Sequence, residues 1–173
     1  MSLTFAEVQA MVDRVNEVAV PADFGGAFYE KFDAWVFADT GAEIRDYLRI
    51  VGDRLVLSNA QRAETKERLI FSPPLLEDME KFLTYHFCNS LRELRRLPRL
   101  LVVSIPVTND KVAPGFAIRE LEEYELHHTG EPVVRCGVDV DLVKFSHYVG
   151  LTPEEIRESA LDPEGKPHFM VMA

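Results

Sequence analysis

The sequence is poor in cysteine and lacks any apolar run long enough to cross a membrane. Only Cys88 and Cys136 occur among 173 residues, far apart and without a CxxC pair. Because secreted disulfide proteins of this size usually carry more cysteines, we expect reduced, buried thiols in a cytoplasmic protein. No stretch approaches the roughly 18 consecutive apolar residues of a membrane span. The N-terminal segment carries Glu7 and Asp13 and has no long apolar run, so a signal peptide is not expected.

Basic residues are outnumbered by acidic ones. The chain has 19 Lys and Arg against 29 Asp and Glu, which gives a formal net charge of −10. A nucleic-acid-binding domain needs a basic face to neutralise phosphates. The total does not exclude a local basic patch, but it disfavours nucleic acid as a partner. It favours a cationic partner, or simply solubility.

The usual catalytic signatures are missing. No glycine-rich phosphate loop and no nucleophile elbow of the GxSxG type occurs. Ser146 and His147 are adjacent, so on a helix their side chains diverge by about 100° and cannot form a dyad. His127 and His128 would point to opposite sides of a strand, which argues against a shared metal ion. We therefore expect no enzymatic activity, metal or cofactor, with an enzyme of unfamiliar site as an alternative.

The patterns that are present predict one α+β domain over residues 1–173. Thr4 and Glu7 have the spacing of a capping box and begin an amphipathic helix, which residues 21–26 follow as a loop. Short strand-like runs at 33–39, 42–51, 54–59 and 65–72 predict an antiparallel meander. A long amphipathic helix follows at 73–97, with His86 expected as a hydrogen-bonded core residue. Further strands are expected at 99–107 and, as a hairpin or irregular pair, at 116–137.

The segment KFSHYVGLTPEEIRES, residues 144–159, has the outline of a helix-turn-helix. A short helix ends at Gly150, and Thr152 begins the next helix, with Pro153 at its first position. In a DNA-reading helix this end would meet phosphates, but here it offers Glu154 and Glu155, which would repel them. We interpret the pair as a structural cap on the domain. A nucleic-acid-binding or regulatory module remains the alternative function.

One acidic run exceeds the background. Glu120, Glu122, Glu123 and Glu125 surround Tyr124 within six positions, and we call residues 120–125 the acidic strip. On one extended strand Glu120, Glu122 and Tyr124 would share a side. A solvated acidic face is one interpretation. The other is a recognition surface, in which carboxylates and an aromatic anchor hold a basic protein.

The chain also resembles a known group of proteins. The evidence is the Trp-bearing segment AWVFADTGAEIRDYLRIVGDRLVL, the following helix LLEDMEKFLTYHFCNSLREL, and the closing segment DLVKFSHYVGLTPEEIRESALDPEGKPHF. Over roughly residues 30–169 the sequence is similar to immunity proteins of bacterial polymorphic toxin systems, in particular the antitoxin family paired with the tuberculosis necrotizing toxin. The resemblance implies a non-enzymatic protein that binds an NAD-hydrolysing toxin domain and protects the producing cell.

Physical reasoning then suggests how such an inhibitor works. A cleft that cleaves NAD must bind a pyrophosphate, so it should present Arg or Lys donors. The acidic strip could satisfy those donors, with Tyr124 and Phe116 as aromatic anchors. The loop at 108–115, with Asn109 and Asp110, is long enough to enter a cleft. The expected partner is one toxin domain per chain.

Overall fold

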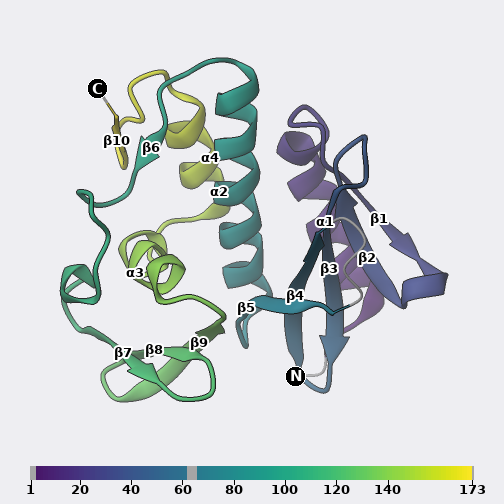
Figure 1. Cartoon of the computed structure of the whole chain (residues 1–173), viewed down its shortest axis with the longest axis horizontal. Coiled ribbons are helices and arrows are strands. Elements are labelled where there is room, and N and C mark those ends of the chain that lie inside the picture. The colour runs from purple at the N-terminus through teal and green to yellow at the C-terminus, as the bar shows by residue number, and fades with distance from the viewer. Residues whose placement is uncertain (1–2, 62–65, 173) are drawn as a thin grey trace.

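The computed structural model describes residues 3–61 and 66–172, and in this part of the chain it contains four α-helices and an eight-stranded antiparallel sheet (Figure 1). The strand order is β1-β2-β3-β4-β5-β9-β8-β7. The elements of the N-terminal half are α1 (Phe5–Ala19), β1 (Gly25–Tyr29), η1 (Glu30–Phe32), β2 (Ala34–Ala38), β3 (Ile44–Val51), β4 (Arg54–Gln61) and β5 (Arg68–Ser72). The remainder are α2 (Leu76–Leu94), β6 (Leu100–Leu101), η2 (Asn109–Lys111), β7 (Phe116–Glu120), β8 (Tyr124–His128), β9 (Glu131–Cys136), α3 (Asp139–Tyr148), α4 (Pro153–Leu161) and β10 (Met170–Val171).

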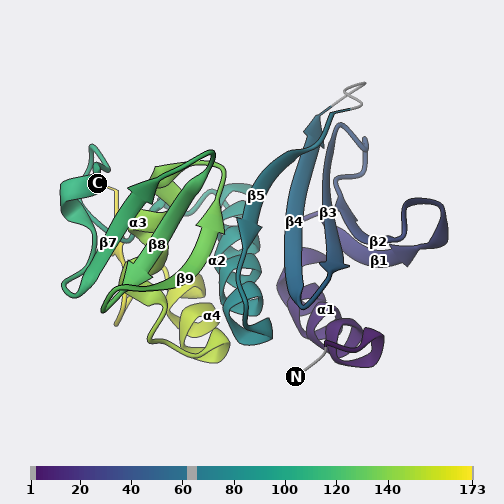
Figure 2. The same cartoon turned by 90° about the horizontal axis from the view of Figure 1, so that it is seen from below.

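The predicted fold class is confirmed. The N-terminal helix begins with the expected capping box, in which Thr4 and Glu7 exchange hydrogen bonds. The meander is formed by β2 to β5, and α2 lies between the two halves of the sheet, with α3 and α4 closing the C-terminal side (Figures 1 and 2). Residues 62–65 lie outside the described residues. They belong to the connection between the strands expected at 54–59 and 65–72 and include the first residue of the second strand.

The sequence prediction places the start of the first strand wrongly. The loop expected at 21–26 gives way at Gly25 to β1, which pairs with β2. The side-chain amide of Asn16 in α1 accepts from the N–H of Gly26 and donates to its C=O, both at 2.8 Å. The helix thus satisfies the outward-facing N–H and C=O of Gly26, as a further strand would. No local periodicity reports such a long-range contact.

The segment at 99–107 was expected to be a buried strand, but only Leu100–Leu101 is extended as β6, paired with β10. Pro98 and Pro106, which have no N–H to donate, flank it.

His86 is exposed on α2 rather than in the core, since Phe82 and Phe87 take the inward positions beside it. Its Nε2 lies 3.8 Å from Oδ2 of the buried Asp46.

A continuous hydrophobic core joins the helices to one face of the sheet. Its members come from both ends of the chain: Val8, Met11, Val12 and Val15 of α1, Phe37, Leu48, Leu57 and Phe71 of the meander, Met79, Leu83 and Phe87 of α2, and Leu126, Val134, Leu142 and Phe145 beyond. Burying each fully buried side chain of this kind stabilises the fold by about 1.5–3 kcal/mol.

Both cysteines are buried and free, as expected, and burial raises the pKa of each thiol to about 12.

Candidate interaction surface

The acidic strip is divided by a chain reversal, so the single extended strand expected for it is wrong. Glu120 ends β7 and pairs with Tyr124, the first residue of β8. Residues Leu121–Glu123 form the connecting loop, in which the N–H of Leu121 donates to the C=O of Glu123 at 2.8 Å. The strip therefore forms the tip of a β-hairpin, and we call residues 120–123 the hairpin tip.

The hairpin tip presents carboxylates around an apolar side chain. Glu120, Glu122 and Glu123 are exposed, and none of them forms an ion pair with the residues that the structure describes. Leu121 between them is 62% exposed. Sequence reasoning overlooked Leu121 because its loop contains no Gly, Asn or Asp, the residues that normally indicate a hairpin turn.

Tyr124 and Glu125 are less available for contact with a partner protein than the sequence implies. Tyr124 is half-buried and packs against the core, opposite Cys136 of β9. Glu125 lies on the other face and accepts hydrogen bonds from Arg135 at 2.8 Å and from His127 at 3.2 Å. Burial works to raise the pKa of the Glu125 carboxyl, but the bonds from Arg135 and His127 outweigh it, so its pKa is lowered. This carboxylate is already neutralised within the protein.

The other predicted contact residues lie at the opposite end of β7. Asn109 and Asp110 are exposed in η2, close to the start of that strand, and Phe116 stacks on His128 with ring centroids 4.5 Å apart. A side-chain hydrogen bond from Thr108 lowers the pKa of Asp110. A five-residue strand spans about 16 Å. The structure therefore separates these residues from the hairpin tip instead of gathering all the candidates into one site.

The end of β7 opposite the hairpin tip is tied to neighbouring elements. β7 is an edge strand of the sheet, remote from β1 (Figure 2). The preceding loop is attached to α3 where the N–H of Ala113 donates to Oγ of Ser146 at 2.9 Å. Lys111 Nζ donates to the C=O of Ser104 and of Pro106, at 2.9 and 2.6 Å. These bonds fix the loop beside the hairpin before any partner binds.

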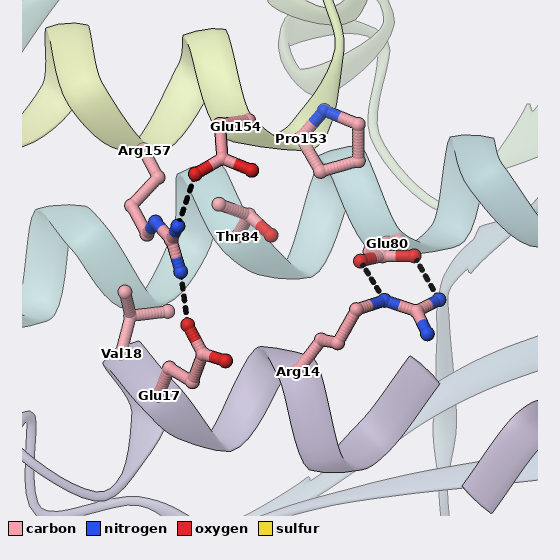
Figure 3. A pocket seen from close by; sticks show the side chains of 8 residues that line it. All are labelled: Arg14, Glu17, Val18, Glu80, Thr84, Pro153, Glu154 and Arg157. Atoms are coloured by element: carbon pink, nitrogen blue, oxygen red, sulfur yellow. Dashed lines mark hydrogen bonds and ion pairs between the residues drawn. The ribbon is translucent and has the colours of Figure 1, made fainter. Parts of the chain in front are cut away.

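A polar cavity of about 110 Å³ lies between α1, α2 and α4 (Figure 3). Arg14 donates twice to Glu80, at 2.8 and 2.7 Å, across α1 and α2. Arg157 of α4 donates to both Glu17 and Glu154. The cations that line this cavity are thus held by carboxylates, which indicates that the cluster joins the helices rather than binding a ligand.

The same contacts bear on the helix-turn-helix alternative. Helix α4 packs against α2 through Ile156 and Ala160. Its N-terminal end carries Glu154, paired with Arg157, and Glu155, which completes a capping box with Thr152. A helix in this position offers no basic surface for a phosphate backbone.

The described residues contain no group of three or more His, Cys, Asp or Glu that could hold a metal ion. Among the same residues, no helix is long and apolar enough to span a bilayer.

Comparison with known proteins agrees with the resemblance seen in the sequence. Two curated relatives are each 27% identical over 134 residues, covering 75% of this chain and 74% of theirs. They are the immunity factor for TNT of Mycobacterium tuberculosis (strain ATCC 25618 / H37Rv) and the immunity factor for TNT homolog of Mycobacterium bovis (strain BCG / Pasteur 1173P2). The solved structure of Rv3902c from M. tuberculosis has the same fold, with a TM-score of 0.78 at 20% identity over 98% of this chain and 95% of that one. The sequence pattern of immunity protein 61 matches residues 22–168, and the chain therefore belongs to the immunity protein 61 family.

Proposed function

We propose that this protein is an immunity factor that binds a cognate NAD-hydrolysing toxin domain, one to one, in the cytoplasm of the producing cell. It occludes the active site of that toxin and catalyses no reaction of its own. Membership of an immunity protein family and the names of the relatives support the role. The observation that carries the proposed contact is Leu121, exposed between carboxylates that have no partner among the described residues.

The hairpin tip suits a cleft that binds a dinucleotide. Such a cleft needs Arg or Lys donors for the pyrophosphate, and Glu120, Glu122 and Glu123 supply acceptors for them. Leu121 fills an apolar subsite of the kind that holds a nicotinamide or adenine ring. Strand pairing at Glu120 and Tyr124, with the bond from Leu121 to Glu123 across the loop, limits the conformational entropy lost on association.

The charge of the whole molecule favours rapid capture. The formal net charge is −10, and the free carboxylates of the tip face outward at one end of the sheet. Opposite charges speed protein association by roughly 10- to 1,000-fold, and added salt weakens the effect. A rapid on-rate matters for an inhibitor that must bind a lethal enzyme before it depletes NAD.

Charge reversal at the tip tests this proposal. We expect equimolar wild-type protein to abolish NAD loss in an assay of the purified toxin domain. The double variant E122K/E123K should associate roughly ten-fold more slowly, with a weaker salt dependence, in stopped-flow measurements. Leu121→Ala should mainly raise the off-rate, since it removes apolar contact without changing charge.

The matched control is E93K/E158K, which reverses two exposed carboxylates on α2 and α4 and gives the same net charge. If both double variants slow association equally, the interface lies elsewhere. If toxin saturated with wild-type protein still consumes NAD, occlusion of the active site is refuted.

A further inference from the structure

A second cavity, of about 140 Å³, lies at the opposite end of the sheet from the hairpin tip. Its lining comes from α1, β1, β2, β3 and the turn before β2, namely Phe5, Phe28, Asp33, Trp35 and Ile50. Strand register places Phe28 directly opposite Trp35. Figure 2 shows α1, β1 and β2 far from β7 and β8, so one small partner cannot cover both places.

Three aromatic rings form one wall of this cavity. The ring centroid of Phe5 lies 4.9 Å from that of Phe28 and 4.8 Å from that of Trp35, and the latter two are 5.1 Å apart. Trp35 forms the floor, only 2% exposed, whereas Phe5 is 50% exposed at the rim. An aromatic ring left half in water at a cavity mouth offers a surface for a partner group.

The rings are held in place before any ligand arrives. Phe5 is the first residue of α1, and the capping box of Thr4 and Glu7 fixes that end of the helix. The indole N–H of Trp35 donates to Oε1 of Gln9 at 2.8 Å, which fixes the orientation of the indole. A preformed wall of this kind loses little entropy when it binds.

A carboxylate completes the site. Asp33 is exposed, lies in the left-handed region with φ 46°, and forms no ion pair with any residue that the structure describes. The faces of aromatic rings carry partial negative charge. The cavity therefore combines apolar walls with negative electrostatics from two sources, which is a combination that attracts organic cations.

We propose that this cavity receives the side chain of an arginine presented by a protein partner. A guanidinium stacks on aromatic faces and pairs with a carboxylate at its edge, and it loses less hydration than an ammonium group does. The cavity is smaller than the roughly 300–1,000 Å³ of drug- and cofactor-sized sites, so it suits one side chain rather than a dinucleotide. The net charge of −10 adds to the attraction for a basic partner.

This site is independent of toxin occlusion through the hairpin tip. It gives the protein a second contact surface for a basic segment, at the far end of the sheet. Loss of the arginine site would therefore leave toxin inhibition intact, and failure of the hairpin proposal would leave the arginine site untouched.

Fluorescence provides the test, because Trp35 is the only tryptophan in the sequence. We expect acetyl-arginine amide to change Trp35 emission saturably at millimolar concentrations. Acetyl-citrulline amide, which has the same shape without the charge, should bind at least five-fold more weakly. Asp33→Asn should weaken arginine binding by a similar factor while keeping the backbone, since Asn also tolerates positive φ.

Glu131→Gln, which removes an exposed carboxylate at the start of β9 in the other half of the sheet, is the matched control and should bind as wild type does. Phe5→Ala should abolish the response, with circular dichroism used to verify that the variant is folded. A non-saturable response, or equal binding of citrulline and arginine, would overturn the assignment.

Discussion

Arg92 is almost completely buried, with 1% of its surface exposed, and it forms no ion pair with a carboxylate of the described residues. Its guanidinium donates instead to backbone oxygens: to Pro98 at 2.9 Å, Ala160 at 2.9 Å, Asp162 at 2.6 Å and Pro163 at 3.1 Å. The last three belong to the end of α4 and the turn after it, where helical carbonyls have no partners of their own. Arg92 thus fastens the C-terminal turn to α2.

Replacing Arg92 with Lys should therefore destabilise the protein although the charge is kept. A lysine ammonium cannot reach all four carbonyls, and each buried acceptor left without a donor costs about 1–3 kcal/mol. We expect a loss of roughly 2–4 kcal/mol in the free energy of unfolding, measured by urea titration. Arg95→Lys, at an exposed position one turn away, serves as the control. Equal stability of the two variants would show that the fork geometry of Arg92 is unimportant.

The sequence indicated which residues of the acidic strip carry charge, but not which of them are already paired within the protein. The abundance of carboxylates around Tyr124 was visible, and their exposure at Glu120, Glu122 and Glu123 agrees with a solvated or recognition surface. The engagement of Glu125 by Arg135 was not visible, because that partner lies on a neighbouring strand ten residues away.

At the scale of elements, the junction between β5 and β9 joins the two halves of the sheet. The paired residues there are Phe71 with Cys136 and Ser72 with Arg135. Gly137 follows at once, and its N–H donates to the C=O of Ile70 at 3.3 Å. A Cβ on Gly137 would lie 2.1 Å from the backbone oxygen of Leu69, a distance that no side chain can tolerate. The close approach of the two strands thus requires glycine at this position.

Gly137→Ala should accordingly separate the strands and lower the free energy of unfolding by about 2–3 kcal/mol. The control is Gly150→Ala, because a Cβ at Gly150 would have nothing within 4 Å and that residue does not adopt positive φ. Thermal unfolding of the two variants would measure the difference. A Gly137→Ala protein as stable as Gly150→Ala would mean that the junction relaxes without cost.

At the scale of the whole molecule, the core extends across that junction. Trp35 of β2 and Cys136 of β9 belong to one cluster of buried residues, which α2 links through Leu83 and Phe87. An uninterrupted core favours cooperative unfolding, in which neither half is stable alone. In physical terms, the expectation that residues 1–173 form one domain means that the two halves unfold together.

Equilibrium unfolding can test this expectation with a reporter in each half. Trp35 fluorescence follows the N-terminal half, and pulse alkylation of Cys136, read by mass spectrometry, follows the other. Burial keeps the Cys136 thiol protonated, with a pKa of about 12, and inaccessible until β9 opens. We expect both reporters to give the same urea midpoint. Separate transitions would instead indicate two units that unfold independently.

The sequence by itself determined the main helices, the meander and the resemblance to a family. Helical periodicity and capping residues specified α1, α2 and the C-terminal pair, and alternating apolar runs specified the meander, because these signals depend on neighbours within a few positions. The excess of acidic residues, and with it the preference for a basic partner, was equally a property of the chain alone.

Only the tertiary structure decided which side chains meet. It reversed the chain at Leu121–Glu123 and so placed Leu121 in the hairpin turn of the acidic strip. It also paired Glu125 with Arg135 and brought Phe5 of α1 to Trp35 and the unpaired Asp33. These outcomes depend on packing between elements far apart in sequence, where no local period carries information. The surfaces that a partner can recognise are therefore set by how the elements pack, although most of the helices and the meander strands are set by local pattern.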